Sequence, residues 1–308
     1  MDKIRLASLL IFIAAMAILA FGVTAGKSGQ IELKLAATSN IDGTDLLEEF
    51  IRRFKTKRLY VVEKSIDDPV VVKTVGDPGR IAELLESGEI HAALLDDPET
   101  VERLLGEETV SLVAPILSTE YVIVGPSRDP AGIKDLGIVE AAAKLAGKEA
   151  PFVAARDGSS TGIAMRKLLA MAKKNPWYQP TDLNARDALK EAIEKKAYAL
   201  ADLGTALDLL IPRVAAGAET EGQKTQAQPK AAAVEGKILS RGKEDLRDEY
   251  SFVAVNPEKF PGTNYMGSDA FMELCRETNV TRMIANFNRN RTGESIYRPA
   301  PPARKKAG

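Results

Sequence analysis

The sequence predicts an α/β fold with a largely parallel sheet, because short apolar strands alternate with amphipathic helices along most of the chain. The length of 308 residues is sufficient for two lobes of ordinary domain size. Apolar residues make up 45% of the chain and charged residues 28%, which is typical of a globular protein. The net charge of −1 gives no indication of nucleic-acid binding.

The first series of strands and helices occupies the N-terminal third of the chain. Residues 31–37 alternate in polarity and predict a strand, and the helix that follows carries its apolar residues on one face. The later elements are expected as strands at 59–63 and 70–75, a helix at 79–87, a strand at 90–95, a helix at 99–105, and strands at 110–117 and 120–124.

A second series follows, interrupted by a segment of different composition. Its elements are expected as helices at 135–146, 162–174 and 184–196, strands at 152–154 and 197–201, and a helix that ends near residue 210. Residues 214–248 are polar and poor in large apolar side chains, which favours a mobile surface insertion. A strand from residue 250 and helices at 268–277 and 281–288 complete the series, and the tail 299–308 is expected to be disordered.

Residues 1–26 form a leader with a short basic start, an apolar run at 6–23 and small residues before a possible cleavage point between Ala25 and Gly26. The run is close to the length that spans a bilayer. A cleaved signal peptide and an uncleaved membrane anchor therefore both remain open. Either one places the body in the periplasm or on the outer face of the cytoplasmic membrane.

Two loops rich in hydroxyl groups are the strongest functional signals. Arg156, Ser159, Ser160 and Thr161 lie between an expected strand and the start of a helix. Free backbone N–H groups, hydroxyl donors and the positive end of the helix dipole together suit a small anion. The alternative is ordinary helix capping by one of the hydroxyls. Residues 38–40 form a second loop of this kind after the first strand.

Other chemistry is largely excluded by composition. His91 is the only histidine, so a catalytic triad or a zinc site built on several histidines is not available. Cys275 is the only cysteine, and its amphipathic surroundings favour a buried apolar role. Asp96-Asp97-Pro98 is interpreted as a turn rather than a metal site, and no nucleophile with a partner base is identifiable. We therefore expect no enzyme activity, no metal and no cofactor.

Several segments of the chain, taken in order, match the sequence pattern of one protein family. The clearest are Glu120-Tyr-Val-Ile-Val-Gly-Pro-Ser-Arg-Asp-Pro-Ala-Gly-Ile133 and Ala197-Tyr-Ala-Leu-Ala-Asp-Leu-Gly-Thr205. Further matching segments are residues 35–40, 88–98, 152–161, 253–265, 284–287 and 293–299. Together they extend over roughly residues 33–212 and 250–299, and in this order they resemble the periplasmic tungstate-binding proteins of ABC importers.

The resemblance implies a type II periplasmic-binding-protein fold, with two lobes, two crossover hinges near residues 118–122 and 250–255, and a ligand cleft between the lobes. It implies a first lobe of residues 27–119 and 256–298, and a second lobe of residues 120–255 that includes the insertion at 214–248. The two hydroxyl loops, one per lobe, would then face each other across the cleft. The implied ligand is tungstate or molybdate, and the implied partner is an ABC permease in the membrane.

The chain departs from the family pattern at several cleft positions. The first family threonine is Ala37 here, and the family arginine of the second loop aligns with Ala155, one place before Arg156. An ionised Asp77 near the cleft would repel an anion, whereas Arg186 adds a compensating cation. The candidate ligand-binding residues are Thr38, Ser39, Asn40, Arg156, Ser159, Ser160, Thr161 and Arg186.

Three hypotheses about function follow from these departures. The first is a receptor that delivers tungstate or a related oxyanion to an importer. The second is an anchored protein with a degenerate pocket that serves as an accessory or structural subunit of a membrane complex. The third is a receptor for another small ligand.

Overall fold

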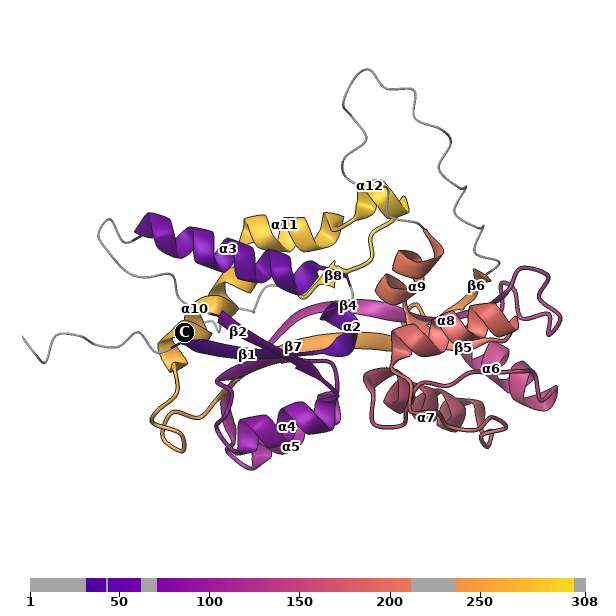
Figure 1. Cartoon of the computed structure of the whole chain (residues 1–308), viewed down its shortest axis with the longest axis horizontal. Helices are drawn as coiled ribbons and strands as arrows, with labels where there is room; N and C mark the ends of the chain where they lie inside the picture. The colour runs from indigo at the N-terminus through magenta and orange to yellow at the C-terminus, as the bar shows by residue number, and fades with distance from the viewer. Residues whose placement is uncertain (1–31, 43, 62–70, 212–235, 302–308) are drawn as a thin grey trace, which may run out of the picture.

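The computed structural model describes residues 32–42, 44–61, 71–211 and 236–301 (Figure 1). The leader 1–26, most of the polar segment 214–248 and the end of the tail lie outside these ranges, so the predictions made for them stay predictions. Within the described ranges, no helix combines the length and the apolar character needed to cross a membrane.

The first lobe is built on a sheet in the order β2-β1-β3-β7-β4. Strands β1 (Leu33–Thr38), β2 (Val71–Gly76) and β3 (Ala92–Leu95) are parallel, whereas β7 (Arg247–Val255) pairs antiparallel with β3. Helices α3 (Leu46–Val61), α10 (Tyr265–Arg276) and α11 (Thr278–Asn286) cover one face, and α4 (Pro78–Glu86) and α5 (Pro98–Gly106) cover the other (Figure 1).

Each face of this sheet carries its own apolar core. Phe50 and Phe54 of α3 pack with Phe271 of α10 on one side, where the Phe54 and Phe271 rings lie 5.2 Å apart. Ile81 of α4 and Leu104 of α5 pack on the other side. Burial of such side chains supplies about 1.5–3 kcal/mol each, so both faces hold the strand ends in fixed positions.

The second lobe is smaller and has an antiparallel sheet. Strands β5 (Ala199–Asp202) and β6 (Gly236–Arg241) pair with the second part of β4. The helices of this lobe are α6 (Ile138–Gly147), α7 (Ser160–Ala172), α8 (Ala185–Lys195) and α9 (Leu203–Leu210). In Figure 1 they surround the far end of β4.

Two long strands join the lobes. Strand β4 (Val110–Pro126) pairs with β7 from Val110 to Glu120, and from Tyr121 onward it pairs with β5 and β6. Strand β8 (Arg298–Pro299) adds to β4 just before this change of partners. The α/β two-lobe architecture expected from the sequence is confirmed, and the passages between the lobes run through β4 and β7.

Some expected elements need correction. The sheet is mixed rather than largely parallel, because every pairing of β4 and β7 is antiparallel. Residues 59–61 of the strand expected at 59–63 belong to α3 instead, and residues 62–63 lie outside the described ranges. The two strands expected at 110–117 and 120–124 are the single strand β4. The insertion expected to reach residue 248 stops earlier, because Gly236–Arg241 form β6.

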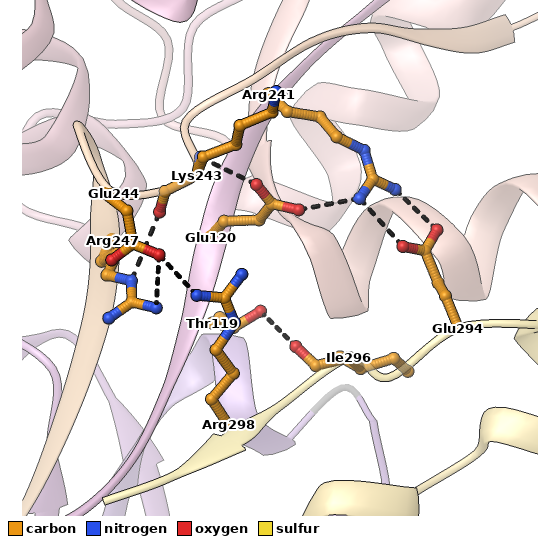
Figure 2. A network of polar contacts seen from close by, with 9 residues as sticks. All are labelled: Thr119, Glu120, Arg241, Lys243, Glu244, Arg247, Glu294, Ile296 and Arg298. Carbon is orange, nitrogen blue, oxygen red and sulfur yellow. Dashed lines mark hydrogen bonds and ion pairs between the residues drawn. The ribbon is translucent and has the colours of Figure 1, made fainter.

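A polar network fixes the junction between the lobes, as Figure 2 shows. Arg241, at the end of β6, contacts Glu120 of β4 at 2.9 Å and Glu294 of the C-terminal segment at 2.6 Å. The Thr119 hydroxyl donates to the Ile296 carbonyl at 2.8 Å. The C-terminal segment is thereby tied to β4 at the point where the chain changes lobes.

Candidate functional site

A cavity of about 310 Å³ is lined by residues from both lobes. The first lobe contributes the short helix α2 (Ser39–Asp42), which follows β1, and the end of β2. The second lobe contributes the loop before α7 and the starts of α8 and α9. The lining residues are Ser39, Asn40, Asp42, Val75, Gly76, Arg156, Asn184, Ala185, Arg186 and Thr205.

Arg186 gives the cavity wall a positive charge. Its Nη2 lies 2.6 Å from Asp208 Oδ2, and Nη2 of Arg291 lies 3.0 Å from Asp208 Oδ1. The Asp208 side chain is only 1% exposed. Two guanidinium groups therefore share one buried carboxylate, so the cluster carries a net charge of +1. Arg186 lines the cavity, and its Nη1 is buried and has no hydrogen-bond partner among the described residues.

Arg156, the other cation of the cavity, is already paired. Its Nε lies 2.7 Å from Oδ2 of Asp77, and its Nη2 donates to Oδ1 at 2.9 Å. This two-point ion pair connects the second lobe to the first, because Asp77 precedes α4. Asp42, the acidic lining residue, pairs with Lys73 and so does not stand alone against an anion.

The remaining hydroxyls of the second loop have structural partners or lie apart from the cavity. Ser159 is the N-cap of α7: its Oγ accepts from the Gly162 amide at 3.1 Å and donates to the Arg156 carbonyl at 2.7 Å. Ser160 donates across the lobes to Asp96 at 2.6 Å and lines a different cavity of about 280 Å³. Thr161 is buried, without a hydrogen-bond partner among the described residues. The capping interpretation therefore applies to Ser159.

Of the eight candidate residues, the structure places four around the 310 Å³ cavity, namely Ser39, Asn40, Arg156 and Arg186. The other four, Thr38, Ser159, Ser160 and Thr161, do not line it. Thr38 is fully buried at the end of β1, and its hydroxyl has no hydrogen-bond partner among the described residues.

Three buried carboxyl groups lie where the lobes meet. Burial raises the pKa of Asp96 to about 7, against the hydrogen bond from Ser160, which lowers it. Burial also raises the pKa of Asp248, which accepts from Asn40 Nδ2 at 3.1 Å and from the Tyr250 hydroxyl at 3.0 Å. The pKa of Asp202 is raised by burial as well, and this residue caps α9.

No group of three or more acidic, histidine or cysteine side chains within the described part of the chain is placed to hold a metal ion. Asp97 instead caps α5, since it accepts from the Thr100 amide at 3.1 Å. His91 accepts from the Lys34 amide at 3.2 Å, and burial lowers its pKa. Cys275 is fully buried, and burial raises the pKa of its thiol.

Sequence reasoning missed part of the cavity. Asp208 and Arg291, which hold Arg186 in place, are distant from it in the sequence and carry no local signal. Thr205 had a signal, because it follows a buried strand and begins a helix, as the two hydroxyl loops do. The Asp77–Arg156 pair joins residues 79 positions apart, so only the fold brings it together.

No protein-family model matches the chain. It is 25% identical over 285 residues to a putative ABC transporter anion-binding protein of Haloferax volcanii, an alignment covering 90% of this chain and 75% of the relative. It is 23% identical over 310 residues to the tungstate-binding protein TupA of Peptoclostridium acidaminophilum, covering 96% and 98% of the two chains.

Solved structures show the same fold. The tungstate-binding protein TupA of Desulfovibrio alaskensis matches with a TM-score of 0.66 and 22% identity, covering 88% of this chain and 99% of that one. A tungstate ABC transporter structure from Geobacter sulfurreducens matches with a TM-score of 0.67 and 23% identity, covering 83% and 98%. The resemblance to the periplasmic tungstate-binding proteins is thereby confirmed, and the chain has the two-lobe fold of type II periplasmic binding proteins.

Proposed function

We propose that this chain is an extracytoplasmic solute-binding protein that captures a small oxyanion, tungstate or molybdate, in the 310 Å³ cavity and delivers it to an ABC permease. The observation that carries the proposal is Arg186, whose buried Nη1 has no hydrogen-bond partner among the described residues and belongs to a cluster with net charge +1. A charged donor of this kind gives strong hydrogen bonds to an oxyanion.

The neutral donors around Arg186 fit the same ligand. Ser39 and Asn40 approach from the first lobe, whereas Thr205 and the start of α8 approach from the second. A tetrahedral oxyanion offers acceptors in several directions, and donors from two lobes surround it better than donors from one face. The proposed ligand-binding residues are therefore Ser39, Asn40, Arg186 and Thr205. Arg156 joins them only when it is released from its ion pair with Asp77.

The proposal places the body outside the cytoplasmic membrane, with the leader 1–26 acting as a signal peptide or an anchor. The names of the two curated relatives support this placement, because they refer to an ABC transporter and to tungstate binding. The accessory-subunit hypothesis is not favoured, since a pocket that had lost its function would not be expected to keep a buried donor available at its wall.

The test is isothermal titration of the purified chain with tungstate, molybdate, sulfate and phosphate. Arg186→Gln removes the charge while Asp208 keeps its bond to Arg291. A hydrogen bond from a charged donor contributes about 1.5–3 kcal/mol, so we expect the affinity to fall roughly 10- to 100-fold.

Arg52→Gln is the matched control, because Arg52 is 64% exposed on α3 and pairs only locally with Glu49. We expect its affinity to equal that of the wild type. The proposal is wrong if the folded wild-type chain gives neither heat nor thermal stabilisation with any of the four anions. It also fails if Arg186→Gln binds as tightly as the wild type.

A further inference from the structure

The Asp77 carboxylate occupies the edge of Arg156 that an anion would use. Both oxygens of Asp77 face the guanidinium, at 2.7 Å from Nε and 2.9 Å from Nη2. Arg156 lines the cavity, and Asp77 directly follows Gly76, which also lines it. Two oxygens of a tetrahedral oxyanion would meet this edge of a guanidinium in the same two-point geometry. Only one of the two partners can be bound there at a time.

Capping of α4 does not explain the position of the Asp77 carboxylate. Helices α4 and α5 both begin with an Asp-Pro pair, Asp77-Pro78 and Asp97-Pro98. Asp97 caps its helix with a bond from the Thr100 amide, whereas the Asp77 side chain makes no capping hydrogen bond. Its carboxylate is directed across the lobes to Arg156 instead.

The lobes have other direct contacts near this pair. Ser160 of α7 donates to Asp96 at 2.6 Å, and Lys167 of α7 lies 3.4 Å from Asp97. The Asp77–Arg156 pair is partly open to water, with side chains 21% and 41% exposed. Its exchange for another anion therefore needs neither separation of the lobes nor loss of the two other contacts.

We propose that Asp77 competes with the oxyanion for Arg156. The Asp77 carboxylate holds Arg156 until a ligand displaces it, and this competition sets the affinity of the site. This inference rests on the proposed function and concerns the regulation of the same site. A ligand with two acceptor oxygens and a full double charge displaces the carboxylate more readily than a singly charged one, so Asp77 also favours dianions.

The experiment compares tungstate affinity by isothermal titration in the wild type and in Asp77→Asn. Asparagine is nearly isosteric and is a favoured N-cap, so α4 is retained. Loss of the competing ion pair and of a like charge is expected to tighten binding about fivefold. Asp157→Asn is the control, because the Asp157 side chain is 63% exposed in the same loop and its carboxylate pairs with Arg166. Its affinity should be unchanged.

A second variant links the effect to Arg156. Arg156→Ala should weaken binding more in the Asp77→Asn background than in the wild type, because Arg156 is free to bind the ligand only in the former. If Asp77→Asn folds poorly, the titration is repeated with Asp77→Ser, which also keeps a capping side chain for α4.

The outcomes separate this inference from the proposed function. Wild-type binding with equal or weaker binding by both Asp77 variants overturns the competition and leaves the proposed function in place. Binding by the wild type together with tighter binding by both Asp77 variants supports both. Absence of binding in every folded variant overturns the proposed function, and the competition with it.

Discussion

At Asp96, burial and hydrogen bonding act on the carboxyl group in opposite directions. Burial disfavours the charged form, while the hydrogen bond from the Ser160 hydroxyl favours it, and burial is the larger effect. The pKa of about 7 lies well above the ordinary value of 3.8. The folded state therefore binds this proton more tightly than the unfolded state does.

The stability of the protein should therefore depend on pH through Asp96. The stabilisation that the neutral Asp96 carboxyl contributes is fully present below the pKa that this group has in the unfolded chain. It is lost as the pH rises from that value toward 7, by up to about 1.4 kcal/mol per pH unit. Asp96→Asn keeps an acceptor for Ser160 and removes the titration. We expect the variant to be more stable than the wild type at pH 8, with the difference shrinking toward pH 4, in urea unfolding monitored by circular dichroism.

Glu102→Gln serves as the control for this measurement, because Glu102 is exposed on α5. Its stability should follow the wild type at each pH. A constant difference between Asp96→Asn and the wild type from pH 4 to pH 8 would show that Asp96 does not take up a proton on folding.

Helix α7 is the element on which the two interpretations of the hydroxyl loop diverge. Ser159 accepts the Gly162 amide and so satisfies one of the free donors at the start of the helix. Ser159→Ala should lower the free energy of unfolding by about 1 kcal/mol, the ordinary value for loss of an N-cap. The affinity for tungstate should not change, because Ser159 does not line the cavity.

Ser159→Thr retains a capping hydroxyl and is expected to recover most of the lost stability. Thermal unfolding and titration of the same samples separate the two roles. A large loss of affinity in Ser159→Ala with unchanged stability would assign the side chain to the ligand and contradict the capping role.

Local patterns predicted individual elements better than they predicted where elements end. The α4 region was expected as a helix at 79–87 because its apolar residues recur at helical spacing, and the structure places this helix at Pro78–Glu86. Strand β4 was expected as two strands because the polar run Ser118-Thr119-Glu120 interrupts the apolar pattern. These residues stay in the strand because they pair with β7. Strand β6 was missed since it follows a long polar segment and depends on pairing with β4.

For the whole molecule, the junction network of Figure 2 links the C-terminal segment to the second lobe, in addition to the Arg291–Asp208 pair. Arg241→Met removes the contacts to Glu120 and Glu294 and leaves the mostly buried Glu120 without this cation. We expect the free energy of unfolding to fall by about 1–2 kcal/mol, because the side chains are partly screened by water. Chemical denaturation gives the value.

Arg80→Met is the matched control, since Arg80 is 62% exposed and pairs only with Glu83 one turn away. A change within about 0.5 kcal/mol is expected for it. Equal effects of the two substitutions would mean that the junction network contributes no more than a surface pair.

The candidate site could be predicted from the sequence only in part. Ser39 and Asn40 were found because a polar loop after a buried strand tends to lie at a sheet edge, where sites form. The charge balance could not be found, because it depends on contacts between lobes. Arg156 was predicted to bind the anion but is paired with Asp77, and Arg186 is held in place by Asp208 and Arg291.

The pairing of β4 with β7 across the junction determines how the lobes can move. The ladder runs through the junction, with Ser118 opposite Glu249, Thr119 opposite Asp248 and Glu120 opposite Arg247. A two-stranded ribbon twists readily but resists any motion that pulls its strands apart, since each lost backbone bond has a cost. The lobes are thus linked by a ribbon that allows them to twist relative to each other but resists separation of its two strands. Ligand exchange would proceed by a rotation whose axis is the ribbon itself.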